Sequence, residues 1–119
     1  MLKMILMQRN GHGSKKFEVW NVELSPTQGS EINKIHPCLI VSPNEVNKFL
    51  DTVVIIPMTS TIKPYPTRLD CHFKGKDGLL VVDQIRSVDK IRLIGKLGVM
   101  DVKTSKDICV LIMETFKYQ

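Results

Sequence analysis

Short apolar runs, separated by proline, glycine and charged residues, constrain this chain more than any other feature. The segments PCLIVS (37–42) and TVVIIPMTS (52–60) are rich in aliphatic and β-branched residues, and each is short for a helix. A continuous apolar run of this length is typical of a strand that is covered on both faces. We therefore expect two central strands of a small, mainly β domain.

Other strands are predicted where apolar and polar residues alternate or where shorter apolar runs occur, at 17–24, 67–73 and 79–85, and residues 93–98 are predicted to form a short strand or a turn. The sequence KGKDG at 74–78 has the composition of a hairpin turn between two of them. If the strand pattern continues beyond 85, Asp83 and Ile85 point to one side, and Gln84 and Arg86 point to the other.

Only the C-terminal segment has a helical pattern. Asp101 or Thr104 is a suitable N-cap, and apolar residues then recur at spacings of three and four, as at Ile108, Ile112 and Phe116. The predicted fold is mainly β: a small antiparallel barrel or half-barrel with a C-terminal α-helix.

Length and charge limit the organisation and the partners. The chain has 119 residues, enough for one domain, and we expect a peripheral segment at 1–15 followed by a single domain at 16–119. Lysine and arginine number 17 against 12 acidic residues, which gives a formal net charge of +5. A basic domain of this size favours polyanionic partners, nucleic acid before an acidic protein.

The three cysteines, Cys38, Cys71 and Cys109, are far apart and have no spacing typical of zinc ligands. We therefore expect no metal and no cofactor, and packed thiols in a reducing cytoplasm. No apolar stretch approaches the ~20 residues of a membrane-spanning helix, so no membrane association is predicted.

Several motifs in order carry a resemblance to a known family: VWNVELSPTQGSE, HPCLIVSPNEVN, VVIIPMTS, YPTRL and GLLVVDQIRSVDKIRL. Over residues 17–116 the chain resembles the MazF/PemK toxins. The resemblance implies an SH3-like barrel capped by a C-terminal helix, a homodimer, and an endoribonuclease that cuts single-stranded RNA at specific sequences without a metal. It also implies an acidic, partly disordered antitoxin as partner.

Metal-free RNA cleavage needs a base for the 2′-hydroxyl, a proton donor for the leaving 5′-oxygen, and donors or positive charge at the phosphate. The resemblance implies His36, Thr59 and Glu31 as catalytic candidates. A threonine at the place of Thr59 contacts the scissile phosphate in relatives, and Glu31 is a base or an RNA-positioning group. Without the resemblance, Glu31 is interpreted as a solvated loop carboxylate.

His36 departs from the family pattern, because most relatives carry an arginine before this proline. Histidine acts as an acid or base near neutral pH but lacks the guanidinium fork that suits a phosphate. Three hypotheses follow: His36 does modified chemistry, Lys34 or Arg86 holds the phosphate, or the chain has reduced activity. We favour reduced activity at this stage.

The remaining candidates are predicted to bind RNA or to support the site. The RNA-binding candidates are Ser30, Lys34, Ser60, Arg86 and Tyr65, and the supporting ones are Asp83 and Gln84. The alternative function is a non-catalytic toxin-like protein that binds RNA or an antitoxin, or that inhibits gyrase through protein contacts.

Overall fold

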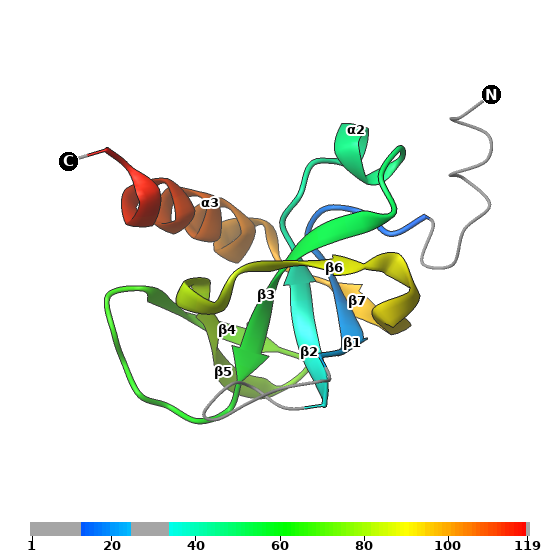
Figure 1. Cartoon of the computed structure of the whole chain (residues 1–119). Coiled ribbons are helices and arrows are strands. Elements are labelled where there is room, and N and C mark those ends of the chain that lie inside the picture. Colours follow the sequence, from blue (N-terminus) through cyan, green and yellow to red (C-terminus); the bar gives the residue numbers. More distant parts are fainter. Residues whose placement is uncertain (1–12, 25–33, 119) are drawn as a thin grey trace.

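The computed structural model describes residues 13–24 and 34–118. This part of the chain forms a strongly bent antiparallel sheet with one long helix packed beside it (Figure 1). The elements in chain order are β1 (Glu18–Glu23), β2 (Ile35–Ile40), α2 (Asn44–Asn47), β3 (Thr52–Thr59), β4 (Arg68–Phe73), β5 (Lys76–Val81), η1 (Val82–Gln84), β6 (Arg86–Asp89), η2 (Lys90–Arg92), β7 (Leu93–Val99) and α3 (Val102–Phe116). The prediction of a mainly β domain with a C-terminal helix is confirmed.

Strand β3 organises the sheet, whose order is β4-β5-β3-β2-β1-β7. On one edge β3 pairs with β2, and on the other it changes partner along its length. Residues 52–55 pair with β6, whereas Met58 and Thr59 pair with β5. Pro57 lies at this change, where its missing N–H donor disturbs the pairing least. The sheet therefore has two parts, here called wings, that share β3: β4 and β5 form one wing, and β1, β2, β6 and β7 form the other.

Both faces of the central strands are buried, as the apolar runs predicted. The consecutive residues Cys38, Leu39 and Ile40 are all fully buried. Because side chains alternate along a strand, they belong to two clusters on opposite faces. One cluster contains Val19, Leu39, Ile56, Cys71, Leu80, Val82, Met100 and Ile108, and the other contains Val22, Leu24, Cys38, Ile40, Val53, Ile55, Val88 and Leu93.

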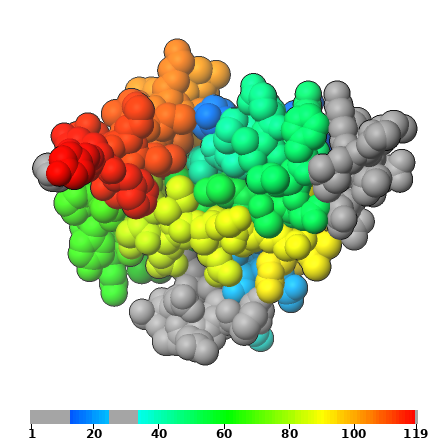
Figure 2. All heavy atoms as spheres, turned by 45° about the horizontal axis from the view of Figure 1, so that its top comes forward, coloured from blue at the N-terminus to red at the C-terminus, as the bar shows by residue number. Residues whose placement is uncertain are grey.

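Helix α3 covers the first of these clusters. The Asp101 carboxylate caps its N-terminus by accepting a hydrogen bond from the backbone N–H of Thr104 at 2.9 Å. Ile108 is fully buried in the cluster, while Met113 and Phe116, farther along the helix, are exposed. The helix contacts β4 and η1, and Figure 2 shows it above the segment that leads into β6. The apolar face of α3 is thus only partly used within the monomer.

The predicted hairpin turn at 74–78 is confirmed. Lys74 and Gly75 connect β4 to β5 with positive φ angles of 50° and 79°, as a tight two-residue turn requires. The turn is shorter than predicted, because β5 already begins at Lys76.

The predicted strand over 79–85 is wrong beyond Val81, where the chain turns into the 3₁₀-helix η1. The backbone N–H of Val82 donates to the Thr67 carbonyl, and the N–H of Ile85 donates to the Val82 carbonyl. The first bond continues the β4–β5 pairing by one residue pair, and the second closes a single helical turn. The expected strand alternation of Asp83 and Gln84 therefore does not occur.

The cysteines are free, and two of them are buried as predicted. Burial raises the pKa of Cys38 to about 12 and that of Cys71 to about 11, so both thiols stay protonated. Cys109 is partly buried against the first cluster. Within residues 13–24 and 34–118, no helix has the length and apolar character needed to span a membrane.

The packing of α3 predicts that Ile108→Ala lowers the free energy of unfolding by about 2–5 kcal/mol, the usual cost of emptying a buried site. Val102→Ala on the same helix is the control and changes it by less than about 0.5 kcal/mol, because Val102 is exposed. Urea unfolding of the two variants measures the difference. Equal effects would mean that α3 does not pack through Ile108.

Candidate functional site

Two pockets meet at Thr59, the last residue of β3. The first, here called the histidine pocket, has a volume of about 360 Å³, and its lining includes His36, Thr59, Ser60, Lys74, Lys76 and Asp77. The second, the arginine pocket, has a volume of about 460 Å³, and its lining includes Thr59, Lys63, Tyr65, Arg68, Asp83 and Gln84. Both volumes lie within the roughly 300–1,000 Å³ of ligand pockets.

Strand pairing brings His36 and Thr59 into the same pocket. Strands β2 and β3 are antiparallel, with Cys38 opposite Pro57, so the start of β2 lies beside the end of β3. On the other edge, Thr59 pairs with Leu79 at the beginning of β5. The β4–β5 hairpin thereby places its lysines on the opposite wall. Three segments distant in sequence build one site.

The Thr59 hydroxyl is oriented by its own turn. Its Oγ1 accepts a hydrogen bond from the backbone N–H of Thr61 at 3.1 Å. The hydroxyl proton therefore remains available to donate to an oxygen of a bound ligand. Gly78 allows the strand to pass this close, because a Cβ atom there would lie 2.8 Å from the Thr59 carbonyl oxygen.

His36 is half-buried and mainly neutral. Burial lowers the pKa of its imidazole below the ordinary 6.5, and a hydrogen bond with the Met58 backbone opposes this only in part. Nε2 is buried and has no hydrogen-bond partner among the described residues. One of the two ring nitrogens of a neutral imidazole carries a lone pair that can accept a proton. The imidazole therefore provides a proton acceptor and no fixed positive charge.

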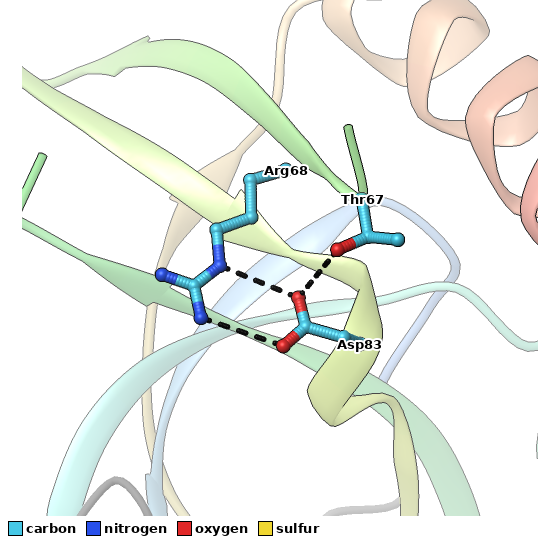
Figure 3. A network of polar contacts seen from close by, with 3 residues as sticks. All are labelled: Thr67, Arg68 and Asp83. Atoms are coloured by element: carbon cyan, nitrogen blue, oxygen red, sulfur yellow. Dashed lines mark hydrogen bonds and ion pairs between the residues drawn. The ribbon is translucent and has the colours of Figure 1, made fainter. Parts of the chain in front are cut away.

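Arg68 and Asp83 form the centre of the arginine pocket (Figure 3). Nε of Arg68 lies 3.3 Å from Oδ1 of Asp83, and Nη2 lies 3.4 Å from Oδ2. The Thr67 hydroxyl donates to the same Oδ1 at 3.0 Å. Burial alone would raise the pKa of Asp83, but the hydrogen bonds from Arg68 and Thr67 outweigh it and lower the pKa. The carboxylate is thus ionised and holds the guanidinium from one side.

The structure distributes the predicted site residues among three places. His36, Thr59 and Ser60 lie in the histidine pocket, and Tyr65, Asp83 and Gln84 lie in the arginine pocket. Lys34 is exposed before β2, Arg86 is exposed on β6, and neither lines these two pockets. Ser30 and Glu31 lie outside the described residues. The functional roles of all these residues stay predictions.

Four basic residues that line the pockets are not among the predicted site residues: Lys63, Arg68, Lys74 and Lys76. Arg68 lies in the motif YPTRL, to which the sequence assigns no role, and Lys74 and Lys76 lie in the predicted turn at 74–78. Their common signal is a positive charge next to a turn or a strand end, which is also frequent in ordinary surface residues. Among the described residues, no group of three histidine, cysteine or acidic side chains is placed to hold a metal ion.

Comparison with known proteins agrees with this architecture. A family described as PemK-like, MazF-like toxin of type II toxin-antitoxin system matches residues 15–116. The Endoribonuclease MazF of Staphylococcus saprophyticus is 33% identical over 100 residues, which cover 79% of this chain and 83% of the relative. Its sequence is thus similar over most of both proteins.

Two solved structures are similar in fold. MazF (Form-I) from Deinococcus radiodurans superimposes with a TM-score of 0.76 at 21% identity, covering 87% of this chain and 96% of its own. An endoribonuclease in complex with its cognate antitoxin, from a mycobacterial species, gives a TM-score of 0.73 at 22% identity, covering 88% and 98%. The bent sheet with its terminal helix is therefore shared with these proteins.

The close approach at Gly78 predicts a difference between two glycines. Gly78→Ala forces a methyl group against the Thr59 carbonyl and lowers the free energy of unfolding by about 1–3 kcal/mol, as overpacking does. Gly95→Ala in β7 is the matched control, because nothing lies within 4 Å of a Cβ atom there, and it leaves stability unchanged or slightly raised. Thermal unfolding compares the two, and equal melting temperatures would contradict the contact.

The lowered pKa of His36 predicts a pH effect on stability. The unfolded chain binds a proton near pH 6.5, while the folded imidazole binds it only at lower pH. Stability therefore falls as the pH decreases from about 7 through this window. Urea unfolding between pH 7.5 and 5.0 should show a smaller loss for His36→Gln than for the native chain. An identical loss in both proteins would show that His36 titrates normally.

Proposed function

The chain belongs to the PemK-like, MazF-like toxin family of type II toxin–antitoxin systems, and from this premise we propose that it is a toxin endoribonuclease. Its substrate is single-stranded RNA, cut by attack of the neighbouring 2′-hydroxyl without a metal ion. The observation that carries the proposal is the shared pocket of His36 and Thr59, with two lysines on the facing hairpin. This set offers a proton acceptor, a hydroxyl donor and positive charge around one phosphodiester.

The reaction begins when the 2′-oxygen attacks the adjacent phosphorus and loses its proton. The bond to the 5′-oxygen then breaks and this oxygen takes up a proton from solvent water, which leaves a cyclic phosphate and a free 5′-hydroxyl. Negative charge grows on the non-bridging oxygens during this step, and donors placed there lower the barrier. Thr59 donates its free hydroxyl proton to one of these oxygens, and Lys74 and Lys76 provide positive charge nearby.

His36 is the proposed base for the 2′-hydroxyl. A neutral imidazole is the form that accepts a proton at pH 7, and we propose Nε2, which has no hydrogen-bond partner among the described residues, as the accepting atom. Because Nε2 is buried, the RNA has to displace the groups that cover it before the transfer. Glu31 remains a second proposed catalytic residue, and the reduced activity expected from the loss of an arginine at position 36 stays a prediction.

Single-stranded RNA fits the arginine pocket better than a duplex does, because unpaired bases expose their edges and faces to side chains. Tyr65 is 55% exposed and offers a ring for stacking, and Gln84 offers an amide for hydrogen bonds to a base. Ser60 lines the histidine pocket beside Thr59 and is proposed to bind the RNA there. Ser30, Lys34 and Arg86 are proposed to contact the RNA outside the two pockets.

An acidic antitoxin is the second proposed partner. The net charge of +5 attracts an acidic, extended peptide, which would compete with RNA for the basic walls of both pockets. We also propose a homodimer in the cytoplasm. The exposed apolar residues Val110, Met113 and Phe116 on α3 are available for contact with a second copy.

The proposal predicts that Thr59→Val slows RNA cleavage at least tenfold, equivalent to ~1.4 kcal/mol of barrier, because one donor to the phosphate is lost. The control is Thr52→Val. Thr52 begins β3 and pairs with Asp89 of β6, so it lies at the opposite end of the strand from the pocket, and this variant keeps the native rate. The assay incubates a long defined RNA with each protein in excess EDTA and maps the cut ends by sequencing.

Chelator-resistant cuts at defined positions by the native chain, slowed by Thr59→Val alone, would support the proposal. Tight retention of intact RNA would instead support the non-catalytic binder. If Thr59→Val lowered the melting temperature and left the rate unchanged, Thr59 would have only a structural role.

A further inference from the structure

The Arg68 guanidinium is fixed on one side and open on the other. Asp83 occupies Nε and one proton of Nη2, which form one of the two forks of a guanidinium (Figure 3). The second fork consists of Nη1 and the remaining proton of Nη2, and it makes no hydrogen bond among the described residues. This second fork has the geometry that binds two oxygens of a phosphate.

Two further contacts hold the guanidinium in place. Its central carbon lies 4.8 Å from the centroid of the Tyr65 ring, within the range of a cation–π contact. The Arg68 side chain is only 16% exposed, so its position is restricted by packing as well as by charge. A fork that is already oriented loses little side-chain entropy when it binds an anion.

The arginine pocket supplies what the histidine pocket lacks. His36 is mainly neutral, so position 36 does not place a fixed guanidinium at the phosphate. The predicted substitutes, Lys34 and Arg86, line neither pocket. Arg68 lines the arginine pocket, which has Thr59 in common with the histidine pocket that contains His36. Lys63 also lines the arginine pocket and adds a second positive charge.

We propose that Arg68 binds the scissile phosphate of the RNA through its open fork, with Asp83 and Tyr65 as positioning residues. The inference rests on the proposed endoribonuclease function. A phosphate at Thr59 then has the threonine hydroxyl on one oxygen and the guanidinium on two. The carboxylate of Asp83 keeps the fork pointed toward the pocket and does not touch the RNA.

The experiment compares Arg68→Gln, which removes the charge, with Arg68→Lys, which keeps the charge but has no fork. Lys106→Gln is the control for loss of one positive charge, because Lys106 is exposed on α3 and outside both pockets. Steady-state cleavage rates are measured over a range of concentrations of an RNA that the native chain cuts, which gives kcat and KM separately. Binding is measured over a salt series on the same RNA with one 2′-deoxyribose at the mapped cut, which blocks the attack.

For Arg68→Gln we expect a kcat at least tenfold below that of the native chain and a log–log salt slope of binding that is smaller by about 0.7, the value for one phosphate contact on a single strand. For Arg68→Lys we expect the native slope with a kcat that remains at least tenfold low. Lys106→Gln should match the native chain in both measurements. Melting temperatures within a few degrees of native show that the variants are folded.

A native kcat in Arg68→Gln, a defect confined to KM, or full rescue of kcat by lysine would overturn the inference while the endoribonuclease function stands. If the native chain cuts no RNA, the proposed function fails. An intact RNA that the chain retains then still tests the phosphate contact through its salt slope, which overturns the inference if it is unchanged in Arg68→Gln.

Discussion

The change of partner along β3 is the constraint on which the site depends. Because β3 pairs with β6 over its first half and with β5 at Met58 and Thr59, the two wings of the sheet meet at its end. This junction places Thr59 between the two pockets. Gly78 permits the close contact of β5 with the Thr59 carbonyl. A larger residue there would move the hydroxyl that the proposed chemistry requires.

The two pockets differ in the charge of their partly buried side chains. The histidine pocket holds a mainly neutral imidazole, and the arginine pocket holds a guanidinium whose charge is balanced by Asp83. Exposed lysines on the β4–β5 hairpin add positive charge at the rim. Since a buried unpaired cation costs several kcal/mol, the least exposed cation that lines the pockets, Arg68, is paired with a carboxylate. An incoming phosphate therefore meets a prepared fork and needs no new buried charge.

The sequence predicted the local structure, but it did not predict which residues far apart in the chain contact one another. The apolar runs predicted the strands buried on both faces, and Asp101 and Lys74–Gly75 predicted the helix cap and the hairpin turn. The helical turn that begins at Val82 was missed because the hydrogen bond from the Val82 N–H to the Thr67 carbonyl forms only when β4 pairs with β5. Arg68 was missed for the same reason: its partner Asp83 is 15 residues away, and only the folded chain brings them together.

The most direct test of the account is a crystal structure of the chain with an RNA that carries one 2′-deoxyribose at the mapped cut. The account predicts the uncleaved phosphate at the junction of the two pockets, with one oxygen roughly 3 Å from Oγ1 of Thr59 and others at similar distances from Nη1 and Nη2 of Arg68. The base on one side would lie near Tyr65. A phosphate bound elsewhere, with Thr59 and Arg68 free of the RNA, would contradict it.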